Sequence, residues 1–374
     1  MLVEGSLILD LHQAPLQSFF RHRFFVRARA ASGGRGGTLK RQTRSSRQRS
    51  SSQRRSTTTP QFAVLRVAAA SLLLLLVCGA SGGMRVLVTG SSRGIGLGLT
   101  RALLEHAGVS QVVATARRPS ESPDLMALAA QPEYSGSGKL VVLPLDVTDA
   151  ASHAALASSL DALGITAIDI AILNHGISNP AHPVDPLLTA SEEDLMAVYR
   201  TNVVGTVLAL QALTPRLTHA QSGPRLCCLL SSAMASVERA AAPGSSGGSV
   251  SYRCSKAALN MLAATWVAEP AVKTAGARCL LLHPGWVQTD MGGAGGRRAA
   301  VTVEQSCAGL LRQIMRAAAG TAAGAAAGTA AGTAAGAAAG AGGASGSEPE
   351  PEFERQLRER RLVFASFEGE LLPF

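Results

Sequence analysis

The sequence predicts an α/β protein whose single folded domain is a doubly wound parallel sheet. From Met84 onward, short strands rich in Val, Leu and Ile alternate with helical segments. Such alternation is typical of a parallel sheet that is covered by helices. The apolar residues of the strands form unbroken runs rather than alternating with polar ones, which indicates that both faces of the sheet are buried.

The predicted elements follow one another in a regular order. Strands are expected at residues 85–90, 111–116, 140–147, 168–174, 225–232 and 277–285. Helices are expected at residues 97–108, 150–163, 192–217 and 252–268. Apolar residues at helical spacing, ended by Gly108, define the first helix. We expect the domain to span 84–316, with 361–374 returning as a last strand at the sheet edge.

The residues before the domain differ from it in charge. The chain has 374 residues and a net charge of +10. Residues 1–83 carry 13 basic and 2 acidic residues, whereas the remainder carries 22 basic and 23 acidic ones. A nucleic-acid-binding protein carries its basic residues on the folded part, so nucleic acid is not expected as a partner. The basic, hydroxyl-rich composition predicts a targeting leader, with a disordered tail as the alternative.

A short apolar segment, residues 67–80, lies inside this leader. Its 14 residues fall short of the roughly 20 that a membrane-spanning helix needs. It resembles the apolar core of a signal sequence, with Arg54 and Arg55 ahead of it as in a twin-arginine leader. A peripheral membrane protein anchored here is the weaker hypothesis. We expect the chloroplast stroma as the location; the alternatives are the mitochondrion, or the cytoplasm if translation starts at Met84.

An Ala- and Gly-rich tract occupies residues 317–346, with Gly at every fourth position from Gly320 to Gly340. Each Gly costs a helix about 1 kcal/mol relative to Ala, and no large side chain offsets that cost. We therefore expect a low-complexity, flexible insertion, followed by a charged helix that ends at residue 360. The six cysteines show no spacing typical of a zinc site or a disulfide framework, so no metal is expected.

A glycine-rich turn, Thr89–Gly96, joins the first strand to the first helix. Gly90 lets the chain turn, Gly94 permits a pyrophosphate to approach, and Gly96 lets the helix pack on the strand. The amides of the helix N-terminus favour a phosphate. The turn therefore predicts a Rossmann-type dinucleotide site. Its expected contacts are Gly90, Ser92, Arg93, Gly94, Ile95 and Gly96.

The end of the second strand indicates which dinucleotide is bound. An NAD site carries an acidic residue there for the ribose 2′-hydroxyl, but this chain has Arg117 and Arg118. Arg can pair with a 2′-phosphate, and Arg93 can reach the same group. We therefore expect NADP(H). Solvated surface arginines are the alternative interpretation.

Tyr252 and Lys256 lie four residues apart, on one face of a predicted helix. An ammonium near a phenol favours the phenolate, so Lys256 is expected to lower the pKa of Tyr252. That suits Tyr252 to general-acid chemistry on a carbonyl oxygen, while Lys256 holds ribose hydroxyls. The preceding strand ends at Ser231 and Ser232, where a hydroxyl can polarise the same carbonyl.

The glycine-rich turn, Ser232 and the Tyr252–Lys256 pair follow one another along the chain in an order that resembles the short-chain dehydrogenase/reductase family. The resemblance covers residues 84–316 and the last 14 residues. The segments YRCSKAALNM and LHPGWVQTDMGG resemble its C-factor/sniffer-like carbonyl reductase branch. The resemblance implies the catalytic residues Asn202, which would hold a relay water, Ser232, Tyr252 and Lys256. The cofactor contacts that it implies are Asp146, Val147, Asn174, Gly176, Tyr252, Lys256, Pro284, Gly285, Val287 and Thr289.

Two departures from the family pattern concern the site. The usual N-N-A-G reads Leu173-Asn174-His175-Gly176, and His175 is expected to be packed or solvent-facing rather than catalytic. The gap of 20 residues from Ser232 to Tyr252 is longer than usual in the family. It leaves Ser231 and, more distantly, Ser236 as alternatives to Ser232.

Together, these features predict an NADPH-dependent oxidoreductase that reduces a small-molecule carbonyl, an aldehyde, ketone or quinone, to an alcohol by hydride transfer. The alternative is a non-catalytic NADP-binding regulatory or scaffold protein of the same fold. Membrane association is not expected, and a homodimer and a homotetramer both stay open.

Overall fold

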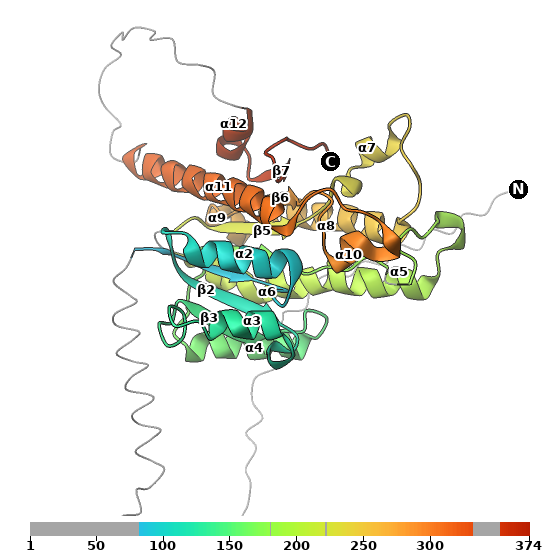
Figure 1. The fold of residues 1–374 in the computed structure, drawn as a ribbon. Helices are drawn as coiled ribbons and strands as arrows, with labels where there is room; N and C mark the ends of the chain where they lie inside the picture. Colours follow the sequence, from blue (N-terminus) through green and yellow to red (C-terminus); the bar gives the residue numbers. More distant parts are fainter. Residues whose placement is uncertain (1–81, 180, 221–222, 332–351) are drawn as a thin grey trace, which may run out of the picture. The chain divides into compact units, whose positions relative to one another are not determined.

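A seven-stranded, wholly parallel sheet organises the folded part of the chain (Figure 1). The computed structural model describes residues 82–179, 181–220, 223–331 and 352–374. The strand order is β3-β2-β1-β4-β5-β6-β7, so the predicted doubly wound sheet is confirmed. The strands are β1 (Met84–Val88), β2 (Val109–Ala116), β3 (Leu140–Pro144), β4 (Ile170–Leu173), β5 (Leu226–Leu230), β6 (Arg278–His283) and β7 (Leu362–Ser366).

Helices cover both faces of the sheet (Figure 1). One face packs against α2 (Gly94–Glu105), α3 (Pro123–Ala129), α11 (Val303–Ala331) and α12 (Glu352–Glu359). The other packs against α4 (Ala150–Ala162), α6 (Gly205–Thr218), α8 (Val250–Ala268) and α9 (Pro270–Thr274). Among the described residues, the shorter helices α5 (Glu192–Tyr199), α7 (Val237–Ala241) and α10 (Asp290–Gly293) add no buried side chain to either core.

The strands bury successive side chains on opposite faces. In β1, Val86 and Val88 belong to the core under α2 and α11, whereas Leu87 belongs to the core under α4, α6 and α8. All three are almost completely buried. This two-sided burial is the physical reason for the unbroken apolar runs in the sequence. Because all the strands are parallel, the loops at their carboxyl ends lie at one edge of the sheet, where ligands bind in such folds.

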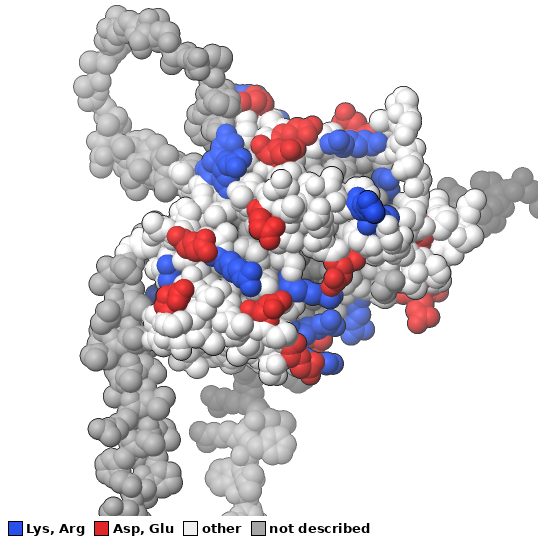
Figure 2. Space-filling view, in the orientation of Figure 1, with Lys and Arg blue, Asp and Glu red and all other residues white. Residues whose placement is uncertain are grey.

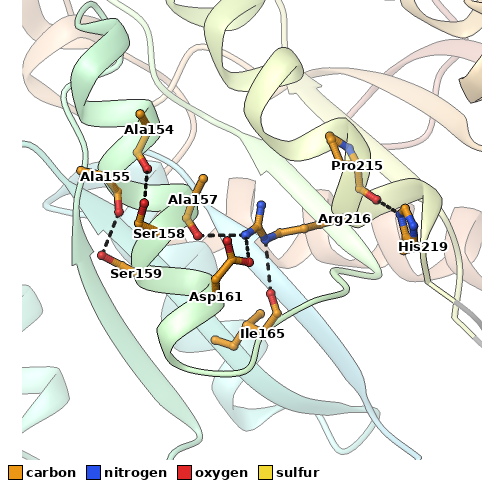
Figure 3. A network of polar contacts seen from close by, with 10 residues as sticks. All are labelled: Ala154, Ala155, Ala157, Ser158, Ser159, Asp161, Ile165, Pro215, Arg216 and His219. Atoms are coloured by element: carbon orange, nitrogen blue, oxygen red, sulfur yellow. Dashed lines mark hydrogen bonds and ion pairs between the residues drawn. The ribbon is translucent and has the colours of Figure 1, made fainter. Parts of the chain in front are cut away.

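A buried arginine ties α6 to α4 (Figure 3). Arg216 donates from Nε to the carbonyl of Ile165 at 3.2 Å and from Nη2 to that of Ala157 at 2.9 Å. It also forms an ion pair with Asp161, at the end of α4. A buried guanidinium needs such partners to offset its desolvation, so these contacts fix α6 in place.

The predicted continuous helix over 192–217 is wrong in one respect. After α5, residues Arg200–Val204 form a single π-helical turn, and α6 begins at Gly205. Such a turn inserts one extra residue into a helix and is frequent at functional sites. Asn202, one of the expected catalytic residues, lies inside it.

The expected flexible insertion is wrong over residues 317–331, because α11 continues through Ala331. Ala317 and Ala318 are buried in the core beneath it, and the Arg316 guanidinium lies 4.7 Å from the centre of the Phe353 ring on α12. These contacts stabilise the helix beyond its local propensity. Residues 332–351 lie outside the described residues. Beyond α12, β7 pairs with β6, at the edge where the sequence places a last strand.

Residues 1–81 of the leader, including the apolar segment 67–80, lie outside the described residues, which begin at 82. In the ranges that the structure does describe, no helix is both long and apolar enough to cross a membrane.

Candidate active site

The glycine-rich turn after β1 forms an open cradle at the N-terminus of α2. Gly90 and Gly94 have φ values of 69° and 55°, a region that favours glycine. A Cβ on Gly96 would lie 2.1 Å from the Gly90 carbonyl oxygen, so no larger residue fits. No side chain caps α2, which leaves its first amides available to a phosphate. The turn thus fits the pyrophosphate of a dinucleotide.

Asn174, after β4, holds this turn in shape. Its Nδ2 donates to the carbonyls of Thr89 and Gly90, both at 3.1 Å, and its backbone amide donates to Thr89 Oγ1 at 3.0 Å. The Asn174 amide is therefore engaged with the turn itself, and supports a cofactor site by fixing the loop that would hold the pyrophosphate.

The arginines at the rim of the cradle have different partners. Arg118 forms a salt bridge with Glu121 at 2.9 Å, and Arg93 forms one with Asp290. Arg117 is exposed at the end of β2 and makes no salt bridge to the part of the chain that the structure describes. Of the three, Arg117 is thus the one whose guanidinium is available to a 2′-phosphate.

Asp146 lies in the turn after β3, which ends earlier than predicted, at Pro144. Its Oδ1 accepts from the backbone amide and the hydroxyl of Thr148, at 2.9 and 2.8 Å. Burial alone would raise the pKa of Asp146, but these hydrogen bonds, with Arg117 and Arg200, outweigh burial and lower it. Asp146 is therefore a fixed, ionised carboxylate beside the expected adenine end of the site.

The segment after β6 covers the cradle. Gly285 has a φ of 86°, and a Cβ there would lie 2.9 Å from the ring of Phe367. Ser306 Oγ donates to the Pro284 carbonyl at 2.7 Å. Val287 is buried, and Thr289 Cγ2 lies 3.2 Å from where a Cβ of Gly94 would be. The segment from Pro284 to Thr289 is thus fixed next to the glycine turn.

Ser232 and Tyr252 meet at the carboxyl end of β5. Ser232 follows the strand and accepts at Oγ from the Met234 amide at 3.2 Å. Tyr252, in the first turn of α8, lies near Ser232, whose hydroxyl acts to lower the pKa of the phenol. The two hydroxyls, from elements 20 residues apart in sequence, therefore form one polar pair that can bind a single carbonyl oxygen.

The other two serines are engaged elsewhere. Ser231 is buried and donates to Asn260 Oδ1 at 2.6 Å. Ser236 donates to the backbone carbonyl of Phe374 at 3.3 Å and caps α7. Geometry therefore favours Ser232 over both alternatives.

The sequence predicts that Lys256 lowers the pKa of Tyr252, and this prediction is wrong. Burial raises the pKa of the phenol above its ordinary value, and the hydrogen bond with Ser232 opposes this rise only partly. Lys256 does not reverse it, because its Nζ lies 5.7 Å from the centre of the Tyr252 ring and donates instead to the Leu230 carbonyl at 2.6 Å. Tyr252 is thus a neutral phenol, the form that a general acid requires.

Lys256 is buried on α8, one turn after Tyr252. Burial lowers its pKa to about 8. A Cβ on Gly176 would lie 3.2 Å from Lys256 Nζ and 3.3 Å from Asn202 Oδ1, so glycine at 176 leaves room for both side chains. The ammonium is charged at neutral pH but loses its proton readily.

Asn202, in the π-helical turn, is held by both ends of its amide. Its Oδ1 accepts from the Ile177 amide at 2.8 Å, and its Nδ2 donates to the Ile177 carbonyl at 2.8 Å and to Ser255 Oγ at 2.9 Å. Its backbone carbonyl accepts from Thr206 Oγ1 at 2.8 Å. The side chain therefore fixes the backbone, and the relay role that the resemblance implies would fall to the carbonyl.

A buried aspartate that the sequence analysis does not identify caps the N-terminus of α8, the helix that carries Tyr252 and Lys256. Asp185 Oδ2 accepts from the Ser251 amide at 3.1 Å, and its carbonyl accepts from the Val250 amide at 3.1 Å. It thus satisfies two of the orphan donors at the start of α8, immediately before Tyr252. No local pattern marks Asp185, because it lies 66 residues from the amide that it binds.

His175 is buried, so its expected packed role is confirmed. Burial, Lys256 and His153 lower its pKa to about 3, which makes it a neutral ring. Among the described residues, no group of three His, Cys, Asp or Glu side chains could hold a metal ion.

A doubly wound sheet with an uncapped glycine turn, and with a serine, a partly buried tyrosine and a buried lysine at the same edge of the sheet, is typical of a nucleotide-dependent oxidoreductase. The family model of short chain dehydrogenases matches residues 84–298, more than half of the chain. The chain belongs to the short-chain dehydrogenase family.

Individual relatives agree with this assignment. The short-chain dehydrogenase RED3 of Pyricularia oryzae is 28% identical over 243 residues, covering 62% of this chain and 90% of RED3. The norsolorinic acid ketoreductase of Aspergillus parasiticus is 32% identical over 241 residues, covering 63% and 84%.

Solved structures show the same fold. An NADPH-bound carbonyl reductase from chicken fatty liver is 30% identical, with a TM-score of 0.59 over 78% of this chain and 94% of that one. The carbonyl reductase Sniffer of D. melanogaster is 21% identical, with a TM-score of 0.58 over 78% and 100%.

Proposed function

We propose that this protein is an NADPH-dependent reductase that converts a carbonyl to an alcohol. The observation that carries the proposal is the Ser232–Tyr252 pair, whose phenol is protonated at neutral pH and has its pKa raised further by desolvation. The pair lies at the carboxyl edge of β5, the same edge of the sheet at which the glycine turn follows β1. A carbonyl oxygen bound there would face two hydroxyl donors.

The preference for NADP(H) is supported by the exposed Arg117 at the end of β2, where an acidic residue would favour NAD. The chicken carbonyl reductase, 30% identical, holds NADPH. When bound, the dinucleotide supplies the hydride. Asn174 would then act by shaping the turn, and the amides at the start of α2 would hold the pyrophosphate.

The chain's own side chains would supply orientation and the proton. Ser232 orients the carbonyl oxygen, and Tyr252 donates its proton to that oxygen as it gains negative charge. The Lys256 ammonium then stabilises the phenolate that Tyr252 leaves behind. With its pKa near 8, Lys256 can pass on a proton, and the Asn202 carbonyl would orient a water for its return.

A non-catalytic NADP-binding protein of the same fold is the second hypothesis. It would need the dinucleotide cradle but neither a serine hydroxyl near the Tyr252 phenol nor a buried lysine one helical turn further along α8. These features support the enzyme.

The two hypotheses separate in one assay. Full-length protein is given NADPH with a panel of aldehydes, ketones and quinones, and both NADPH loss and alcohol formation are followed. If the protein is an enzyme, the amount of NADPH lost should equal the amount of alcohol formed with at least one carbonyl of the panel. NADPH binding without alcohol formation across the panel would support the scaffold instead.

We also propose that residues 1–83 direct the chain to the chloroplast stroma. Support comes from the excess of basic over acidic residues in this segment, which the folded part does not share.

A further inference from the structure

His175 lies between two threonine hydroxyls that belong to different parts of the site. Its Nδ1 is 2.8 Å from Oγ1 of Thr89, which opens the glycine turn after β1. Its Nε2 is 3.2 Å from Oγ1 of Thr206, which lies on α6 one helical turn beyond Asn202. One ring thus spans the distance between the dinucleotide cradle and the π-helical turn.

The hydrogen bonds around the ring have a consistent direction. Thr206 Oγ1 donates to the Asn202 carbonyl at 2.8 Å, so it accepts from His175 and the ring carries its proton on Nε2. Nδ1 then accepts from Thr89 Oγ1, which itself accepts from the amides of Asn174 and His175, at 3.0 and 3.3 Å. One neutral tautomer satisfies every member of the chain.

We propose that His175 is a positioning residue that locks the Asn202 backbone to the glycine turn, so that the proton relay is aligned with the bound dinucleotide. This rests on the proposed function, in which the Asn202 carbonyl orients the returning water. The family pattern places Ala here, which has no polar atom for either threonine. In this chain the ring adds a hydrogen-bonded bridge that Ala would not provide.

Each arm of the bridge can be removed separately. In His175→Asn the amide reaches the position of Nδ1, so the contact with Thr89 stays and the contact with Thr206 is lost. In His175→Gln the amide reaches the position of Nε2, so the contact with Thr206 stays. Thr206→Val removes the hydroxyl that contacts both the Asn202 carbonyl and His175, and it keeps the side-chain shape. It therefore also serves as a background for His175→Asn: if the bridge exists, adding His175→Asn to Thr206→Val should change exchange in residues 200–206 no further.

Amide hydrogen exchange of the full chain tests the bridge without any turnover. His175→Asn and Thr206→Val should speed exchange in residues 200–206 about tenfold, the effect expected for one lost hydrogen bond, and leave 89–96 unchanged. His175→Gln should speed exchange in residues 89–96 and leave exchange in residues 200–206 unchanged. In catalysis, His175→Asn should lower kcat with the Kd for NADPH unchanged, whereas His175→Gln should mainly raise that Kd.

Equal exchange in both segments for the Asn and Gln variants would overturn the proposal, as would unchanged exchange in Thr206→Val. The two His175 variants each remove a different arm, so either one that folds still tests the bridge through the segment whose exchange it changes. If the wild-type chain reduces no carbonyl, the proposed function fails while the exchange pattern still decides whether His175 bridges the two segments.

Discussion

Two groups in the site, the partly buried Tyr252 and the buried Lys256, have pKa values that desolvation moves in opposite directions. Burial disfavours the charged form of each, so it raises the pKa of the phenol and lowers that of the ammonium to about 8. At neutral pH the phenol holds a proton to donate, and the neighbouring lysine is still cationic. Carbonyl reduction needs this combination of a neutral acid and a charge that stabilises its conjugate base.

The alkaline side of the pH profile should report Lys256. Its ammonium form is lost as the pH rises through about 8, so kcat for carbonyl reduction should fall there. Lys256→Arg retains a charge that does not titrate in this range. Its lower residual activity should lack the fall near pH 8, and the same fall in both proteins would exclude Lys256 as its source.

Arg117→Asp should shift the cofactor preference. Replacing a cation that can pair with the 2′-phosphate should lower the ratio of kcat/KM for NADPH to that for NADH by about tenfold or more, as expected for a charge-assisted hydrogen bond. Arg118→Asp is the matched control, because Arg118 already pairs with Glu121. An unchanged ratio in Arg117→Asp would remove Arg117 from the site.

Elements whose evidence is local could be predicted from the sequence, and elements fixed by distant contacts could not. The inner strands, such as β4 and β5, are clear because they bury both faces. The π-helical turn is hidden, because helical spacing continues on either side of it and the contacts of Asn202 come from Ile177, 25 residues away. Likewise, glycine frequency argues against a helix beyond residue 316, but α11 continues to Ala331, and burial of Ala317 and Ala318 stabilises the start of this extension.

The same distinction applies to the site. The glycine turn, Ser232, Tyr252 and Lys256 form motifs of fixed spacing, and the structure brings them to one edge of the sheet. Asp185 and Thr206 belong to no motif. The predicted direction of the Tyr252 pKa is wrong. Helical spacing shows that Lys256 is nearby, but it does not show that the ammonium donates to the Leu230 carbonyl.

Two deletions of equal length test the corrected end of α11. Removing residues 317–331 takes away two buried methyl groups, worth about 1.6 kcal/mol at about 0.8 kcal/mol each, and should lower Tm by at least about 3 °C in a domain of this size. Removing 332–346 should leave Tm nearly unchanged, because the composition of this tract predicts a flexible insertion and loop-closure cost changes slowly with length. Thermal unfolding with equal losses for both would contradict the assignment.

Over the whole molecule, charge separates the leader from the enzyme. Residues 1–83 carry 13 basic and 2 acidic residues, whereas the remainder is nearly balanced. On the face that Figure 2 shows, Lys and Arg are interspersed with Asp and Glu. The folded part thus presents no broad basic surface on that face, and the basic character of the chain belongs to the leader.

The leader should be sufficient to target a fused protein to the chloroplast. A fluorescent reporter fused after residue 83 should enter the chloroplast and be found in the stroma after fractionation. A second fusion, in which the arginines of residues 41–55 are replaced by glutamine, should stay in the cytosol, because the basic residues are what a transit sequence requires. Cytosolic fluorescence of the unmodified fusion, or a reporter in the thylakoid lumen, would contradict the stromal proposal.

The most direct test of carbonyl reduction by this site is the turnover of Tyr252→Phe. The variant removes one hydroxyl and keeps the ring, so NADPH should bind with an unchanged Kd, measured by cofactor fluorescence. Its kcat for alcohol formation from a carbonyl that the wild-type protein reduces should fall by at least about 10², the lower limit for loss of a general acid. Turnover close to that of the wild-type protein would show that Tyr252 is not the acid, and would contradict the mechanism.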